Sequence, residues 1–306
     1  NYRLADTDLS GLLARIAPAF VIGDKNRVEQ LCPDQNLECV GRADFVTKAT
    51  AVFAAVENAA HEGEGIAVQI FTSGTTAAPK AALLRHANLM GYILGTVDFC
   101  SAKAVEAQLV CVPPYHIAGI SALLSSIYAM RRIVILPAFD PDIWLDIVAA
   151  EHVSNVFLVP TMLSRIIDSL NAGKSADLMS LQAIAYGGGR MPIELILDAL
   201  ARFPHCRFTN AYGLTETSST IALLGPDDHR LAQHSDDASI QARLASVGKP
   251  LATVELEIRD DEGQPVATGE SGEIYVRGEQ VAGEYRERSA VDAQGWFPTR
   301  DAGWLD

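Results

Sequence analysis

The stretch FTSGTTAAPK, residues 71–80, gathers side chains that can hold phosphate. It follows an apolar run, residues 66–71, that predicts a strand, and it places hydroxyls, a glycine and a lysine in one loop. Freed backbone N–H groups, hydroxyls and an ammonium all bind anions. Taken alone, the segment is better explained by a solvated turn rich in serine and threonine. The members of the expected phosphate-binding loop are Thr72, Ser73, Gly74, Thr75, Thr76 and Lys80.

A Walker-type phosphate loop is the first alternative, because Gly74 and Lys80 invite it. That motif needs glycine directly before the lysine and serine or threonine directly after it. Here the two positions are Pro79 and Ala81, so the hydroxyl that binds magnesium is missing and the proline offers no backbone N–H. The sequence argues against a Walker NTPase.

Four further segments follow in a fixed order: VPPYHIAG (112–119), YGGGRMP (186–192), NAYGLTE (210–216) and WFPTRD (296–301). Together with residues 71–80 they closely resemble the adenylate-forming superfamily of acyl- and aryl-CoA synthetases, luciferases and peptide-synthetase adenylation domains. Any one segment could arise by chance, whereas five in register are specific. The resemblance covers the chain from Asn1 to Asp306.

The resemblance implies a two-step reaction without a protein nucleophile. A carboxylate is first joined to the α-phosphate of ATP with release of pyrophosphate, and a thiol then displaces AMP. Such phosphoryl chemistry needs mainly alignment and neutralisation of charge. By resemblance, the loop up to Lys80 covers the β- and γ-phosphates, Thr215 contacts the α-phosphate and Glu216 ligates Mg²⁺, a hard cation that prefers oxygen. Without the preceding YGLT, Glu216 would read as a solvated carboxylate at a helix start.

The resemblance also implies where the nucleoside lies. Adenine would lie between Tyr212 and the backbone of residues 187–189, because a run of glycines lets the main chain approach a flat ring. Asp301 would accept hydrogen bonds from the ribose hydroxyls. A strand-to-helix turn and a solvated carboxylate are the plainer alternatives for these glycines and for Asp301. The implied nucleotide-binding set is Thr72, Ser73, Gly74, Thr75, Thr76, Lys80, Gly187, Gly188, Gly189, Asn210, Ala211, Tyr212, Gly213, Thr215 and Asp301.

His116 indicates a branch of the superfamily. Members that activate amino acids carry an aspartate in this region for the substrate ammonium, whereas a histidine or aromatic residue is typical of acyl- and aryl-CoA synthetases. A lone histidine is more often a structural residue, so its role depends on the surrounding match. The implied catalytic residues are Thr215, Glu216, Lys80 and His116. The implied acyl pocket is His116, Ala118, Gly119, Ile120, Gly187 and Leu214, which suits a fatty or aromatic acid better than an amino acid.

Two departures from the family pattern keep a rival function open. Ala77 and Arg300 stand where the family usually has glycine. A positive φ at Ala77 would cost about 1 kcal/mol, and Arg300 could either add a cation beside the nucleotide or disturb Asp301. The rival is a catalytically weak homologue that senses nucleotide or acyl ligand. An α/β-hydrolase is excluded because the chain has no GxSxG elbow.

Composition sets limits on the partners. The chain has 306 residues, 49% of them hydrophobic, and a net charge of −14, which argues against nucleic-acid binding. The expected partners are ATP or AMP with Mg²⁺, a carboxylic acid, and the thiol of CoA or of a carrier protein; oligomeric state stays open. Five cysteines without a CxxC pair indicate neither zinc nor disulfides and predict a cytoplasmic protein. The apolar run 117–130 is too short to span a bilayer, and no transmembrane segment is expected.

Strand-like and helix-like runs alternate along most of the chain, which predicts an α/β fold with mostly parallel sheets and helices on both faces. The expected strands are residues 18–22, 66–71, 108–112, 132–136, 155–159, 181–186 and 207–210. The expected helices are residues 44–58, 87–99, 119–130, 142–151, 161–169 and 192–202.

The pattern changes near Ala238, where VELEIRD, EIYVRG and glycine turns predict small antiparallel β structure. By resemblance, residues 1–240 form interleaved layered α/β subdomains that bind nucleotide and acyl group. Residues 241–306 form a small distorted β-barrel that ends before a hinge. The family's separate C-terminal lid domain, which carries a lysine associated with adenylation, would lie beyond Asp306 and is expected to be absent here, so that the chain alone has impaired catalysis.

Overall fold

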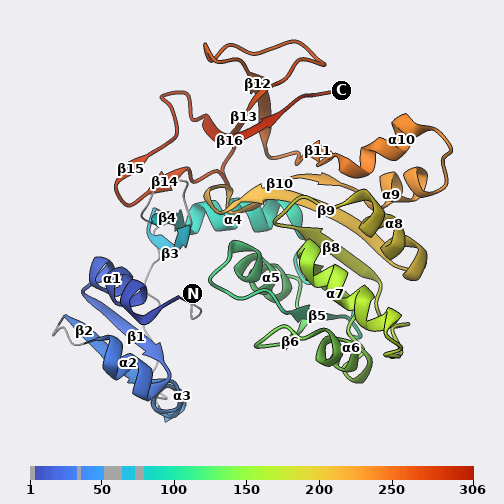
Figure 1. Ribbon diagram of the computed structural model, residues 1–306. Coiled ribbons are helices and arrows are strands. Elements are labelled where there is room, and N and C mark those ends of the chain that lie inside the picture. The colour runs from blue at the N-terminus through green and yellow to red at the C-terminus, as the bar shows by residue number, and fades with distance from the viewer. Residues whose placement is uncertain (1–3, 33–35, 52–63, 73–78) are drawn as a thin grey trace. The chain divides into compact units, whose positions relative to one another are not determined.

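The computed structural model describes residues 4–32, 36–51, 64–72 and 79–306, and the chain divides into two units, Asn1–Ala60 and His61–Asp306 (Figure 1). In the first unit, β1 (Ala19–Gly23) pairs in parallel with β2 (Leu37–Gly41). Its helices are α1 (Asp6–Ile16), α2 (Lys25–Leu31) and α3 (Arg42–Ala51). The strand expected at 18–22 and the helix expected at 44–58 are confirmed as β1 and α3, the latter up to Ala51. Residues 52–58 lie outside the described residues.

A seven-stranded sheet forms the centre of the second unit, with the order β11-β10-β9-β8-β7-β5-β6 (Figure 1). The strands from β9 to β6 are parallel, and β10 and β11 are antiparallel. The mixed, mostly parallel α/β fold is thereby confirmed. The strands are β5 (Ala107–Val110), β6 (Arg132–Ile135), β7 (Asn155–Leu158), β8 (Ala183–Gly187), β9 (Arg207–Leu214), β10 (Ser219–Leu224) and β11 (Lys249–Pro250).

Helices α6, α7 and α8 bury their apolar sides in one hydrophobic cluster with alternate residues of the strands. Trp144, Ile166 and Ile196 are fully buried there beside Leu158 and Tyr186. Helix α5 instead contacts β5, β6, β10 and α4. The second-unit helices are α4 (His86–Thr96), α5 (Ile117–Tyr128), α6 (Pro141–Ala150), α7 (Pro160–Asn171), α8 (Ile193–Arg202), α9 (Pro226–Gln233) and α10 (Ala238–Ala242), with short 3₁₀ turns η1 (Thr215–Thr217) and η2 (Arg243–Ala245).

Local signals explain where these helices begin. Asp140 precedes α6, and its carboxylate accepts hydrogen bonds from the backbone N–H groups of Asp142 and Ile143. Pro141 occupies the first helical position, where its missing N–H costs nothing. Among the described residues, no helix combines the length and apolar character needed to cross a bilayer.

A second sheet is antiparallel and has the order β15-β14-β4-β3. It consists of β3 (Ile66–Thr72), β4 (Lys80–Arg85), β14 (Glu284–Tyr285) and β15 (Arg288–Ser289). The predicted strand 66–71 is confirmed as β3, but it belongs to this antiparallel sheet and not to the parallel strands. Thr72 pairs with Lys80 across β3 and β4, so the loop joins two antiparallel strands. The predicted loop residues Ser73, Gly74, Thr75 and Thr76 lie outside the described residues.

A third sheet contains β12 (Glu255–Arg259), β13 (Gly272–Arg277) and β16 (Phe297–Gly303), all antiparallel. The antiparallel structure expected from VELEIRD and EIYVRG is therefore present. Its three strands form no closed barrel among the described residues, so the barrel is not confirmed. Val276 and Phe297 share a hydrophobic cluster with Ile221 of β10. The predicted domain boundary at 240/241 falls inside the second unit and stays a prediction.

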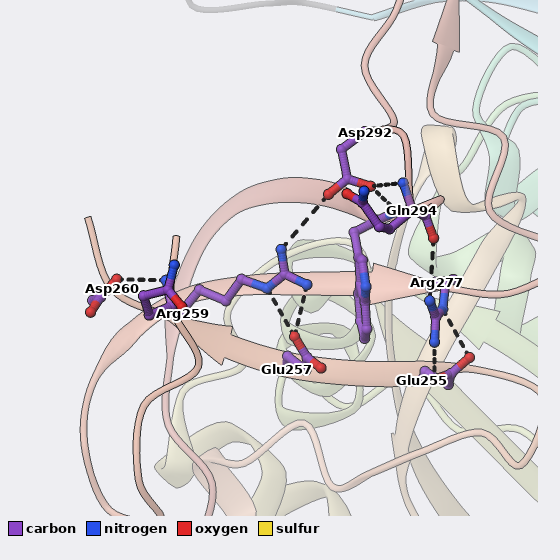
Figure 2. Close-up of polar contacts among 9 residues, drawn as sticks. Glu255, Glu257, Arg259, Asp260, Arg277, Asp292 and Gln294 are labelled. Carbon is purple, nitrogen blue, oxygen red and sulfur yellow. Dashed lines mark hydrogen bonds and ion pairs between the residues drawn. The ribbon is translucent and has the colours of Figure 1, made fainter. Parts of the chain in front are cut away.

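Figure 2 shows the charged groups on this third sheet. Arg259 forms ion pairs with Glu257 at 2.8 Å and with Asp292 at 3.8 Å, and Arg277 forms one with Glu255 at 2.5 Å. Both arginines also contact the indole of Trp296. The distance from the guanidinium carbon to the centre of the ring is 4.7 Å for Arg259 and 4.6 Å for Arg277. These cation–π contacts fix the residue that precedes β16.

Candidate active site

Glu216 lies in the short turn η1, directly after β9, and its side chain is buried, with 7% of the residue exposed. A buried carboxylate is costly unless it accepts hydrogen bonds. The hydroxyl of Tyr285 donates to Oε1 of Glu216 at 2.7 Å. The backbone N–H groups of Ala282 and Gly283 both donate to the backbone oxygen of Glu216 at 2.9 Å. Residues 282–285 thus hold Glu216 at its main chain and at its side chain.

Lys80 joins this cluster through Tyr285. Its Nζ lies 5.5 Å from the centre of the Tyr285 ring, and β14 pairs with β4 so that Tyr285 is opposite Ala82. Burial raises the pKa of Tyr285, and the hydrogen bond and negative charge of Glu216 raise it further, while Arg288 and Arg300 act the other way. The structure therefore brings together two predicted residues, Lys80 and Glu216. The sequence GEYRER, residues 283–288, contains no recognisable motif, so sequence analysis did not point to Tyr285 or Arg288.

The donor set at Glu216 fits a magnesium ion that travels with a nucleotide. Among the described residues, no three histidine, cysteine, aspartate or glutamate side chains lie together as a metal cage. Mg²⁺ usually takes one or two carboxylates and completes its shell with phosphate oxygens and water. Tyr285 donates to Oε1 of Glu216, and Oε2 is the carboxylate oxygen without this hydrogen bond. The residues present thus suit magnesium bound together with phosphate.

Tyr212 and Asp301 also meet, although they come from different sheets. The Tyr212 hydroxyl donates to Oδ2 of Asp301 at 2.7 Å. Burial raises the pKa of Tyr212, and the hydrogen bond to Asp301 adds to the rise. Asp301 itself is exposed, so the carboxylate can accept further hydrogen bonds. The two residues predicted to hold adenine and ribose are therefore neighbours.

Arg300 adopts a left-handed backbone conformation with φ of +66°. Glycine takes this conformation without strain, which agrees with the glycine that the family resemblance implies at this position. Glu273 compensates for the arginine, because it accepts hydrogen bonds from the Arg300 backbone N–H at 3.0 Å and from its guanidinium at 3.4 Å. Asp301 keeps its contact with Tyr212. Glu273 thus holds Arg300, while the next residue, Asp301, contacts Tyr212.

Two of the predicted glycines are required by close approach of the main chain. A Cβ at Gly187 would lie 2.2 Å from the Ala211 carbonyl oxygen, and one at Gly213 would lie 1.9 Å from that of Ser219. Gly187 and Ala211 pair across β8 and β9, so the glycine segment and NAYGLTE lie at the same edge of the sheet. Gly188 has a φ of +72°, and Gly188 and Gly189 are exposed. Asn210 binds the Ser246 carbonyl at 3.0 Å through its side-chain amide.

Most of the remaining predicted pocket residues lie at the start of α5, and Leu214 lies at the end of β9. His116 is the exposed residue directly before this helix, and its ring centre lies 4.7 Å from that of Tyr115. Gly119 is buried, and a Cβ there would lie 2.6 Å from the carbonyl oxygens of Val112 and Pro113. Ala118, Ile120 and Leu214 are half-buried. Their assignment to an acyl pocket stays a prediction, as does the contact of half-buried Thr215 with phosphate.

Comparison with known proteins places this geometry in context. Residues 1–286 match the AMP-binding family, described as AMP-binding enzyme. A feruloyl-CoA synthase of Amycolatopsis sp. is 30% identical over 248 residues, which cover 79% of this chain and 48% of that protein. A 2-succinylbenzoate–CoA ligase of Bacillus cytotoxicus is 29% identical over 241 residues, covering 78% and 47%. The chain thus spans about half the length of the curated relatives it matches.

Solved structures show the same similarity. The o-succinylbenzoate CoA synthetase of Bacillus subtilis, in complex with ATP and magnesium ion, matches with a TM-score of 0.79 and 26% identity, covering 100% of this chain and 61% of that chain. The same enzyme with an acyl-adenylate intermediate gives 0.79, 25% identity and coverage of 100% and 60%. The N-terminal domain of FACL13 from Mycobacterium tuberculosis shares the fold, with a TM-score of 0.83 at 22% identity and coverage of 100% and 76%.

Proposed function

This chain belongs to the AMP-binding enzyme family, and from that premise we propose that it is the nucleotide- and acid-binding part of an acid–CoA ligase. In the proposed reaction, ATP activates a fatty or aromatic carboxylic acid to an acyl-adenylate, and the thiol of CoA then displaces AMP. The observation that carries the proposal is the meeting of Glu216 with Lys80 around Tyr285. A carboxylate for magnesium and a cation for phosphate lie in one place, as this chemistry requires.

The chain's own residues would align the reactants and offset their charge. Lys80, with the loop from Thr72 to Thr76, would neutralise the β- and γ-phosphates, while Thr215 would contact the α-phosphate as the acid's oxygen attacks it and pyrophosphate leaves. Magnesium held at Glu216 would supply positive charge to the leaving phosphates. Fixed positive groups speed such a step because they stabilise the charge that develops in the transition state.

The nucleoside and the acid would occupy neighbouring positions. Adenine would lie between Tyr212 and the Gly187–Gly189 backbone, with Asn210, Ala211 and Gly213 beside it, and Asp301 would accept hydrogen bonds from the ribose. The acyl group would lie along the start of α5, lined by His116, Ala118, Gly119, Ile120, Gly187 and Leu214. The names of the relatives support CoA as the acceptor, and 2-succinylbenzoate supports an aromatic acid. A carrier-protein thiol is the other acceptor, and a lid domain following this region remains part of the proposal.

The rival function was a weak homologue that senses nucleotide or acyl ligand. It rested partly on Arg300, whose left-handed backbone is held by Glu273 while Asp301 keeps its bond to Tyr212. That accommodation favours the enzyme.

Acid-dependent exchange of radioactive pyrophosphate into ATP tests the proposal directly. The full-length protein would be assayed with a panel of fatty and aromatic acids in the presence of magnesium. We expect exchange that depends on one class of acid, followed by acyl-CoA formation when CoA is added. Tight ATP binding without exchange for any acid would favour the sensor, and failure to bind ATP would reject both the ligase and a sensor of nucleotide.

A further inference from the structure

Residues 282–285 hold Glu216 by hydrogen bonds to both its main chain and its side chain. Two backbone N–H groups, from Ala282 and Gly283, fix the main chain of Glu216, and the Tyr285 hydroxyl binds its Oε1 at 2.7 Å. Gly283 makes this approach possible, since its φ is +50° and a Cβ would lie 2.8 Å from the Phe297 ring. A segment 69 residues further along the chain therefore determines the direction of this carboxylate.

Tyr285 is itself held in place. Its neighbour Glu284 forms a two-pronged ion pair with Arg85, with both N–O distances at 2.8 Å. The pairing of β14 with β4 places Tyr285 opposite Ala82, which is fully buried. The neighbouring ion pair and the strand pairing already hold Tyr285 in place. Less conformational entropy of Tyr285 is therefore lost when its hydroxyl binds the Glu216 carboxylate, so the hydrogen bond restricts the carboxylate more strongly than a bond from a mobile phenol would.

Resting on the function proposed above, we infer that Tyr285 is a positioning residue that orients the Glu216 carboxylate toward the magnesium–triphosphate. Its hydroxyl engages Oε1 and so directs Oε2 to the cation. Groups that hydrogen-bond a metal ligand commonly change metal affinity or activity 10–100-fold when they are removed. Tyr285 does not touch the reacting atoms in this scheme, and it acts through Glu216.

The test removes the hydroxyl and keeps the ring. Tyr285→Phe is compared with Tyr275→Phe, a matched control in the same unit whose ring also carries a cation, Arg259 at 4.6 Å. The probes are ATP with and without MgCl₂, and AMP without metal, measured by calorimetry on the full-length protein. We expect Tyr285→Phe to reduce the magnesium-dependent gain in ATP affinity by about tenfold. AMP affinity should stay at the wild-type value, and Tyr275→Phe should match wild type in both.

A double-mutant cycle shows whether Tyr285 acts through Glu216. If it does, Tyr285→Phe has little further effect in a Glu216→Gln background, because the carboxylate that it orients is already gone. A purely structural role would give equal losses in both backgrounds. In the exchange assay, the magnesium concentration that gives half-maximal rate should rise for Tyr285→Phe, with recovery at high magnesium.

The outcomes separate the two proposals. Wild-type magnesium dependence in Tyr285→Phe, equal losses in the two backgrounds, or ATP binding by wild type that magnesium does not affect would each overturn the positioning role. An absence of acid-dependent exchange in wild type would reject the ligase function, and the calorimetry would still decide the role of Tyr285 toward Glu216.

Discussion

The Tyr212 hydroxyl and the Asp301 carboxylate are 2.7 Å apart, although 89 residues separate them in the chain. The bond joins β9 of the seven-stranded sheet to β16 of the three-stranded sheet. Each residue thereby fixes the other, and the exposed carboxylate still faces outward. A ligand that contacts both residues would meet a site that is already formed.

Replacing Asp301 should weaken nucleotide binding. Asp301→Ala removes a charged acceptor from the proposed ribose site, and such hydrogen bonds contribute about 1.5–3 kcal/mol. We therefore expect AMP affinity to fall by at least about tenfold in calorimetry. Asp261→Ala, at an exposed aspartate after β12, is the control and should leave affinity unchanged. Equal affinity in both variants would remove Asp301 from the nucleotide site.

Glu216→Gln should damage turnover much more than AMP affinity. The amide keeps the size of the side chain and weakens the magnesium contact needed while charge moves onto pyrophosphate. We expect the exchange rate to fall at least about a hundredfold, with AMP affinity within about threefold of wild type. An unchanged rate at limiting magnesium would show that Glu216 is not a metal ligand.

The class of acid should follow from His116. An α-ammonium that enters an apolar pocket without a carboxylate partner loses hydration and gains no ion pair. A fatty or aryl acid should therefore exceed its α-amino counterpart by at least roughly a hundredfold in pyrophosphate exchange, equivalent to about 2.8 kcal/mol. Comparable rates for the two acids would contradict the acyl or aryl assignment.

Low pH should destabilise the second unit through His229. This buried imidazole has Nδ1 2.7 Å from the Gly225 carbonyl and Nε2 2.8 Å from the Tyr186 hydroxyl. Burial lowers the pKa of His229 below 6.5, and this effect outweighs the opposing Gly225 hydrogen bond and Asp228 charge. Below about pH 6.5 the unfolded chain therefore binds a proton at His229 more readily than the folded chain does. The contribution of neutral His229 to the free energy of unfolding is fully present above about pH 6.5 and is lost as the pH falls.

Urea unfolding between pH 7.5 and 5 measures this effect. The free energy of unfolding should depend less on pH in His229→Gln than in wild type, by up to about 1.4 kcal/mol per pH unit. His234→Gln, at the exposed end of the same helix, should keep the wild-type slope. The same slope in all three proteins would contradict a neutral His229 in the folded state.

Gly213→Ala should strain the turn that leads to Glu216. The new Cβ would lie 1.9 Å from a backbone oxygen of Ser219, and backbone cannot rotate away as a side chain can. We expect a loss of about 3 kcal/mol in the free energy of unfolding, measured in urea. Gly189→Ala is the control, since its nearest contact would be Pro160 at 3.8 Å, and it should change stability by less than about 1 kcal/mol. Similar losses in the two variants would contradict the steric account.

The sequence predicts the parallel part of the fold well, because each helix and strand there carries its own periodic pattern. The strand predicted at 207–210 is four residues shorter than β9. The observed strand continues to Leu214 because β10 pairs antiparallel with residues 211–214. The orientation of β3 depended on its partner β4, whose other neighbour, β14, comes about two hundred residues later. In the first unit, α1, α2 and β2 were not predicted, although Asp24 caps α2 with a typical side-chain hydrogen bond.

The candidate site divides in the same way. Lys80, Glu216, Tyr212 and Asp301 were predicted because they belong to recognisable motifs. Tyr285 was not predicted, because its proposed role depends on the β14–β4 pairing and on the turn at Gly283, and neither feature has a local signal in GEYRER. Residues that hold other residues depend on tertiary contacts, which periodicity and motif spacing do not report.

The packing of Trp296 gives this chain a built-in optical signal. Its three tryptophans occupy three different surroundings: Trp144 is fully buried in the α/β core, Trp296 is 6% exposed between two guanidinium groups, and Trp304 is 60% exposed. A soluble quencher such as iodide would therefore remove the emission of Trp304 first. What remains comes from one indole in the core and one at the start of the strand that carries Asp301. Fluorescence after quenching would follow events at β16 without any attached label.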